Sequence, residues 1–137
     1  MEKLAHAKNL SVEKAQINGS TNIKAAAQKL IGKAQVIYLP LDNTVVSALS
    51  SLVQVATQAN IPVVANDPSL TGSGLLLALG ADYFKSGMQL GNMIADKIEG
   101  KKLEANIMPS SAKELKINKA VADKLKISIP TDLEKAR

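Results

Sequence analysis

Apolar residues follow two alternating patterns along this chain. Short continuous apolar runs, bounded by glycine, proline or asparagine, predict buried strands, and apolar residues spaced three or four positions apart predict helices. The predicted strands cover residues 11–17, 35–39, 62–65, part of 74–79, 106–108 and 115–117. The predicted helices cover residues 2–8, 22–30, 44–59, 82–98, 119–125 and a last turn at 132–137. Ser20 or Thr21 is expected to cap the helix at 22–30, and Asn118 the helix at 119–125.

This alternation indicates an α/β fold. Strands that alternate with helices of about ten to sixteen residues are typical of right-handed βαβ units, which build a parallel sheet. The expected architecture is a three-layer sandwich with a parallel sheet in the middle. The length of 137 residues suits one domain, so residues 1–137 are interpreted as a single α/β lobe.

Composition narrows the possible functions. The only aromatic residues are Tyr38, Tyr83 and Phe84, too few for a base-stacking platform. The net charge of +5 comes from lysines scattered among acids, with one arginine, so no nucleic-acid partner is expected. The chain has no cysteine, which excludes disulfides and thiolate metal sites. No apolar run is long enough to span a bilayer, and residues 1–20 carry no export signal.

Polar clusters follow three of the predicted strands, at residues 18–20, 42–44 and 66–69. In an open α/β sheet, ligands bind beyond the carboxyl ends of the strands, and these clusters are expected at one such edge. Thr44 starts a helix whose free amides favour an anionic group. Asp67 could receive an ammonium or a hydroxyl. The sequence therefore predicts a site for a small polar solute with donors and acceptors.

Each cluster also has an ordinary structural explanation. Asp42, Asn43 and Thr44 are good helix caps without any ligand. Asp67 before Pro68 is a common turn dipeptide, and residues 18–20 fit a turn and cap better than a site. The sequence alone leaves these alternatives open.

Signals for catalysis are weak. Asp42 and Asp67 could form an acid/base pair, but no nucleophile or metal-ligand spacing accompanies them. His6 is the only histidine and lacks a partner for nucleophilic catalysis. The glycines at 72, 74 and 80 lack the spacing of a dinucleotide fingerprint. We therefore expect a protein that is not an enzyme and that needs no cofactor or metal.

The helix predicted at 82–98 has an unusual face. Gly87, Gly91 and Ala95 recur every fourth residue and would let another backbone approach closely. Large apolar residues border this stripe: Tyr83, Phe84, Met88, Ile94 and Ile98. Packing of this helix on its own sheet is the alternative explanation.

Several runs resemble the ABC transporter substrate-binding protein family that includes tryptophan- and tyrosine-type binding lipoproteins. The runs are Ile37-Tyr38-Leu39-Pro40-Leu41-Asp42-Asn43-Thr44-Val45, Ile61-Pro62-Val63-Val64-Ala65-Asn66-Asp67 and Ala78-Leu79-Gly80-Ala81-Asp82-Tyr83. The tail with Ile117-Asn118, Ala122, Leu125, Ile127 and Pro130 is similar too.

This resemblance implies a type I periplasmic-binding-protein (flavodoxin-like) fold, of which the chain would be the C-terminal lobe. The matching positions for ligand contacts are Asp42, Asn43, Thr44, Asp67 and Ser69. The implied ligand is an amino acid, often an aromatic one, bound between two lobes, and the implied partner is an ABC permease. The implied location is extracytoplasmic, at the cell surface as a lipoprotein or in the periplasm.

Two further expectations depend on the same resemblance. Helix 82–100 would cross to the other lobe, so here we expect a homodimer or a segment exchange through it. One lobe alone should bind its solute weakly, because a two-lobed site buries the ligand between lobes. An alternative with the same fold is the effector-binding domain of a transcription repressor.

Overall fold

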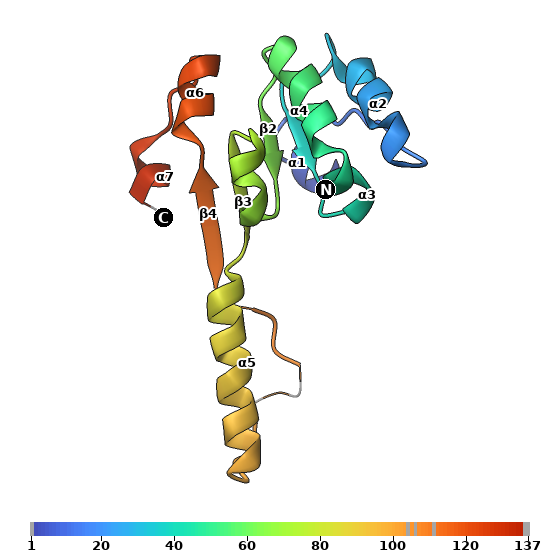
Figure 1. The fold of residues 1–137 in the computed structure, drawn as a ribbon. Helices are drawn as coiled ribbons and strands as arrows, with labels where there is room; N and C mark the ends of the chain where they lie inside the picture. Colours follow the sequence, from blue (N-terminus) through green and yellow to red (C-terminus); the bar gives the residue numbers. More distant parts are fainter. Residues whose placement is uncertain (1, 104, 106, 111, 136–137) are drawn as a thin grey trace. The chain divides into compact units, whose positions relative to one another are not determined.

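The computed structural model describes residues 2–135 apart from 104, 106 and 111 (Figure 1). The helices are α1 (Glu2–His6), α2 (Ile23–Leu30), α3 (Asn43–Ser47), α4 (Leu49–Gln58), α5 (Tyr83–Ile98), α6 (Lys119–Leu125) and α7 (Thr131–Lys135). Two 3₁₀ segments, η1 (Ser20–Asn22) and η2 (Pro68–Ser73), add to them. The strands are β1 (Ile37–Leu39), β2 (Val63–Ala65), β3 (Leu77–Ala81) and β4 (Lys113–Ile117).

The strands confirm the predicted α/β class, with one difference in direction. They form a sheet in the order β1-β2-β3-β4 that is mostly parallel. β4 runs antiparallel to β3, with Leu77 opposite Ile117 and Ala81 opposite Lys113. A strand that closes an otherwise parallel sheet in the opposite direction is common in α/β folds.

The chain divides into two compact units, Met1–Val64 and Ala65–Arg137. The single lobe expected over residues 1–137 stays a prediction. In the first unit, α2 packs against α4 (Figure 1), and short aliphatic side chains fill the space between them and the strands. Its buried residues are Ile23, Ala26, Ala27, Ile37, Leu39, Leu49, Leu52, Val55, Ala56, Ile61 and Val63.

The second unit has its own small core around η2, β3 and β4. Leu75 and Ala78 are fully buried, and Ala122 of α6 is 2% exposed. Asn118 caps α6 as predicted, because its side chain accepts a hydrogen bond from the amide of Val121 at 3.2 Å. α5 buries none of its residues, although it is the longest described helix.

Three predicted elements differ in the structure. Residues 11–17 form no strand, because polar residues at 13, 14 and 16 leave no continuous apolar run and a strand needs a paired neighbour. The helix expected at 44–59 is two helices, interrupted at Ala48, after the β-branched run Thr44-Val45-Val46, which disfavours helix. Of the strand expected at 106–108, residue 106 lies outside the described residues, and 107–108 form no strand.

Gly80 on β3 fixes the turn that follows β2. A Cβ at position 80 would lie 2.2 Å from the carbonyl oxygen of Asn66 and 2.7 Å from Cδ of Pro68. Both distances are far below van der Waals contact, so only glycine allows this approach. The missing side chain at Gly80 thus lets the turn carrying Asp67 lie directly against β3.

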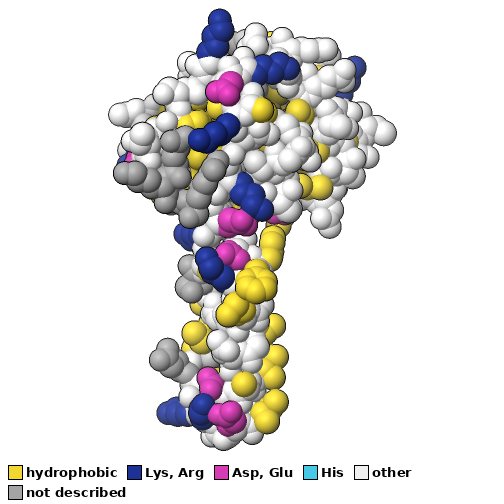
Figure 2. Space-filling view, turned by 60° about the vertical axis from the view of Figure 1, so that its left-hand side comes forward, with side chains coloured by type: hydrophobic (Ala, Val, Ile, Leu, Met, Phe, Trp, Pro, Cys, Tyr) yellow, Lys and Arg dark blue, Asp and Glu magenta, His cyan; other side chains and the backbone are white. Residues whose placement is uncertain are grey.

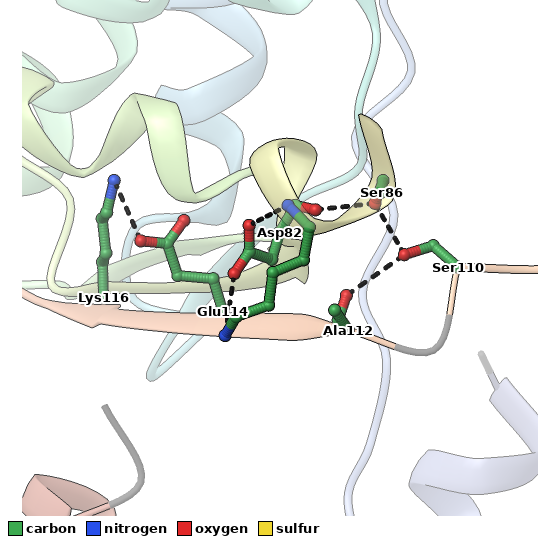
Figure 3. A network of polar contacts seen from close by, with 7 residues as sticks. Asp82, Ser86, Ser110, Ala112, Glu114 and Lys116 are labelled. Atoms are coloured by element: carbon green, nitrogen blue, oxygen red, sulfur yellow. Dashed lines mark hydrogen bonds and ion pairs between the residues drawn. The ribbon is translucent and has the colours of Figure 1, made fainter. Parts of the chain in front are cut away.

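A polar junction connects β3, α5 and β4 (Figure 3). The carboxylate of Asp82 caps α5 by accepting from the Lys85 amide at 2.9 Å and pairs with the Lys85 ammonium at 3.1 Å. The hydroxyl of Ser86 donates to the carbonyl of Asp82 at 2.6 Å and lies 2.7 Å from the hydroxyl of Ser110. The Asp82 amide donates to the carbonyl of Ala112 at 3.1 Å. The backbone hydrogen bond from Lys85, followed by its side chain, lowers the pKa of Asp82.

Replacing Gly80 by alanine should push the turn at Asn66 and Pro68 away from β3. Overpacking of this kind costs about 1–3 kcal/mol. We expect Gly80→Ala to lower the urea midpoint of unfolding, measured by circular dichroism. Gly72→Ala is the matched control, because a Cβ there meets no atom within 4 Å. Equal midpoints for the two variants would contradict this account of the turn.

The lowered pKa of Asp82 predicts a pH-dependent contribution to stability. Its charge stabilises the fold above the ordinary aspartate pKa of about 3.9, and this stabilisation is lost as the pH falls through the lower folded pKa. Asp82→Asn keeps a capping oxygen but removes the charge. We expect the wild type to have the higher Tm at neutral pH and the difference to shrink as the pH falls through the lowered pKa of Asp82. A difference that persists unchanged in acid would disprove the charge effect.

Candidate functional site

Asp42 follows β1 and caps α3 with one of its carboxylate oxygens. Its Oδ1 accepts from the amide of Thr44 at 2.8 Å and from the amide of Val45 at 3.1 Å. α3 has only five residues, and these two amides are already bonded. The prediction that this helix end attracts an anion through free amides is therefore weakened, and the capping explanation of Asp42 is confirmed.

The neighbouring side chains of Asn43 and Thr44 are exposed. The carbonyl of Thr44 accepts from the hydroxyl of Ser47 at 2.8 Å, which steadies the first turn of α3. The structure describes no hydrogen bond of the Asn43 amide group or the Thr44 hydroxyl to the residues it covers. One amide and one hydroxyl are thus presented to solvent just beyond the carboxyl end of β1.

Asp67 follows β2 and is much less exposed. Only 8% of its surface is exposed to solvent. Its Oδ1 accepts a hydrogen bond from the amide of Ser69 at 2.9 Å, and Asp67 thereby caps η2. Pro68 takes the first position of η2, where the missing amide costs nothing. The hydroxyl of Thr71 donates to the carbonyl of Pro68 at 2.9 Å and closes the turn.

The second carboxylate oxygen of Asp67 has no partner among the described residues. No side-chain oxygen or nitrogen in the described part of the chain is both fully buried and without a hydrogen bond. Oδ2 of Asp67 therefore keeps some access to solvent. A carboxylate that is held rigidly by one oxygen and open at the other can accept from an ammonium or hydroxyl group.

The third polar cluster, residues 18–20, behaves as a turn. Ser20 begins η1, and no side-chain hydrogen bond caps that segment or α2 among the residues described. The expected cap by Ser20 or Thr21 is therefore wrong. The structure joins Asp42 with Thr44 in the first unit and Asp67 with Ser69 in the second. That these groups contact one solute stays a prediction.

A groove that the sequence did not predict lies along α5. It encloses about 680 Å³ between one side of the helix and residues 102, 103, 108 and 112, and none of the predicted site residues lines it. Its lining residues are Lys85, Met88, Gln89, Asn92, Met93, Asp96, Lys102, Leu103, Met108 and Ala112. The sequence does contain a pattern that indicates this side of the helix. Polar residues at 85, 89, 92 and 96 are spaced four, three and four apart, which places them on one side of a helix.

The described residues contain neither a candidate membrane-spanning helix nor a candidate metal site. None of the helices there combines the length and the apolarity that crossing a membrane requires. No three or more histidine, aspartate or glutamate side chains within those ranges gather closely enough to hold a metal ion.

Known proteins resemble this chain over nearly its whole length. The sequence model of the ABC transporter substrate-binding protein family matches residues 1–136. A tyrosine-binding protein of Clostridioides difficile is 31% identical over 129 residues, which are 86% of this chain and 37% of that protein.

Solved structures agree with this match. A conserved domain protein of Vibrio cholerae has a TM-score of 0.79 at 32% identity, over 98% of this chain and 46% of that one. A ligand-free, open substrate-binding protein with adhesive properties from Clostridium difficile has a TM-score of 0.80 at 25% identity, over 95% and 44%. The ABC domain from Streptococcus pneumonia in complex with L-Trp shares the fold, with a TM-score of 0.81 at 24% identity over 98% and 46%.

The chain thus spans 37% of the curated relative and less than half of each solved structure. The family, the curated relative and the Clostridium difficile structure are described by binding and not by catalysis, and none of them supports a transcription repressor domain. The family match extends across both compact units. This chain belongs to the ABC transporter substrate-binding protein family.

Proposed function

We propose that this chain forms part of the solute-binding component of an ABC importer and holds a small amino acid without changing it. The match of the family model to residues 1–136 is the observation that carries this proposal. The relative named for binding tyrosine and the structure containing L-Trp support an amino acid with an aromatic side chain as the solute. The proposal includes an ABC permease as the partner and an extracytoplasmic location.

Asp67 is the residue proposed to receive the ammonium group of the solute. Its Oδ1 is held by the Ser69 amide at 2.9 Å, while Oδ2 is open. A charge-assisted hydrogen bond to a carboxylate is stronger than a hydrogen bond between neutral groups. The burial of Asp67 strengthens such a hydrogen bond further, because it is screened less by water. The Ser69 hydroxyl, on the exposed side of the same turn, is proposed to add a neutral contact.

Asn43 and Thr44 are proposed to recognise the carboxylate end of the solute. Their exposed amide and hydroxyl groups can both donate. Asp42 then has a supporting role, since its Oδ1 holds the amides of Thr44 and Val45 and keeps the turn in shape. The chain has only three aromatic residues, so selection of an aromatic solute is proposed to depend on parts of the relatives that this chain does not span.

Binding to this chain alone should be detectable but weak, with a dissociation constant in the millimolar range. We expect L-tyrosine or L-tryptophan to shift the amide resonances of residues 43–45 and 67–70 in a ¹⁵N-labelled sample. N-acetyl-L-tyrosine is the matched control, because it keeps the ring and carboxylate but lacks the ammonium group. Equal shifts with both compounds would contradict the proposed role of Asp67. A micromolar dissociation constant for L-tyrosine or L-tryptophan and this chain alone would contradict a site that is shared between two lobes.

Asp67→Asn separates the charge of this residue from its structural function. Asparagine keeps an oxygen for the Ser69 amide but no longer attracts an ammonium group. Because hydrogen bonds to charged groups contribute about 1.5–3 kcal/mol, we expect affinity to fall roughly tenfold to a hundredfold. Asp123→Asn on the exposed surface of α6 is the control. Comparable losses in both variants, measured by the same titration, would show a nonspecific charge effect.

A further inference from the structure

The turn at residues 18–20 carries the one Asn-Gly pair of this sequence, Asn18-Gly19. The turn precedes η1, and the proposed function gives it no role. Asn18 is exposed, and no hydrogen bond joins its side chain to any of the described residues. The side-chain amide of Asn18 is therefore free to react with the backbone next to it.

An asparagine side chain can be attacked by the backbone nitrogen of the residue that follows it. This nitrogen bonds to Cγ of the asparagine, the side-chain nitrogen leaves as ammonia, and a cyclic succinimide forms. Water then opens the ring at one of its two carbonyl groups, which gives either aspartate or isoaspartate. In isoaspartate the backbone continues through the former side chain. The overall reaction consumes one water and releases one ammonia, and nothing is oxidised or reduced.

Two conditions favour this attack: the following residue is small, and its backbone N–H is not held in a hydrogen bond. Gly19 meets the first condition, because it has no Cβ beside its nitrogen. It meets the second because its N–H has no hydrogen-bond partner among the described residues. Apart from its chain neighbours, no described atom lies within 4 Å of the position that a Cβ at Gly19 would take. The space around the reacting nitrogen is thus open.

Two other exposed asparagines in the first unit lack both conditions. The residue after Asn9 is a leucine whose N–H donates to the carbonyl of Ala5 at 2.9 Å. The residue after Asn22 is an isoleucine whose N–H donates to the carbonyl of Ser20. In both cases a bulky side chain also screens the nitrogen that would have to attack. Solvent exposure alone therefore does not distinguish Asn18, whereas the residue that follows it does.

We propose that Asn18 is a site of spontaneous deamidation in the folded chain, through a succinimide formed with the nitrogen of Gly19. The reaction replaces a neutral amide by a carboxylate, so the net charge falls by one from +5. The isoaspartate product also lengthens the backbone by one carbon just before η1. There the amide of Asn22 donates to the carbonyl of Gly19 at 3.2 Å, so the product alters the start of this segment.

Mass spectrometry of the folded 137-residue chain, incubated in mildly alkaline buffer, gives the first test. Deamidation raises the mass by about 1 Da, and it should be faster at higher pH, because the attacking nitrogen must lose its proton. Trypsin releases residues 15–24, which contain both Asn18 and Asn22, so fragment ions compare the two in one peptide. We expect aspartate and isoaspartate at position 18 and unchanged Asn22. An unchanged peptide, or equal conversion of both asparagines, would overturn the proposal.

Gly19→Ala is the matched control, because it changes the reactivity of the pair without straining the fold. The φ angle of Gly19 is 172°, which any residue adopts, and the added Cβ meets no described atom outside the neighbouring residues within 4 Å. We expect the urea midpoint of unfolding to stay unchanged and deamidation of Asn18 to become at least several-fold slower. Equal rates in Gly19→Ala and the wild type would contradict attack by the nitrogen at position 19.

Unfolding the wild type in concentrated urea separates the effect of the fold from that of the sequence. Because the N–H of Gly19 is free in the fold, we expect Asn18 to convert at comparable rates in the folded and the unfolded chain. Conversion of Asn18 in urea but not in the folded chain would show that the turn protects it, and would overturn the proposal.

Discussion

The close approach of β3 to the turn after β2 is the constraint on which the candidate site depends. Gly80 has no side chain, so Asn66 and Pro68 lie against the strand at distances that any Cβ would forbid. In this turn Asp67 is buried, whereas Ser69 is exposed. The carboxylate is therefore fixed by its surroundings before a solute arrives, and pre-organisation of this kind lowers the cost of binding.

The two aspartates of the predicted site have different physical roles. Asp42 is exposed, and its Oδ1 already satisfies two amides of α3, so its main contribution is to shape the turn. Asp67 is nearly buried and uses one oxygen for a single amide. A cationic group stabilises a buried carboxylate with an open oxygen more strongly than it stabilises an exposed carboxylate. This difference is why Asp67, and not Asp42, is proposed to bind the ammonium group.

Local features were predictable from the sequence, and long-range ones were not. Asn118 and Asp42 cap the helices where their spacing indicated, because capping involves only neighbouring residues. The direction of β4 depends on pairing with β3, 32 to 40 residues earlier in the chain, and no local pattern encodes it. The apolar stripe of α5 (Figure 2) was visible in the sequence, but only the contacts of Pro109 and Ser110 show that the chain covers the other side.

The central proposal is that an amino acid binds at the turns after β1 and β2 and not in the groove along α5. Intermolecular nuclear Overhauser effects from a bound, ¹³C-labelled L-tyrosine test it most directly. The account predicts contacts from the α proton of the amino acid to the amide protons of Thr44 and Ser69. Contacts to Gln89, Met93 or Met108, which line the groove on α5, would contradict it.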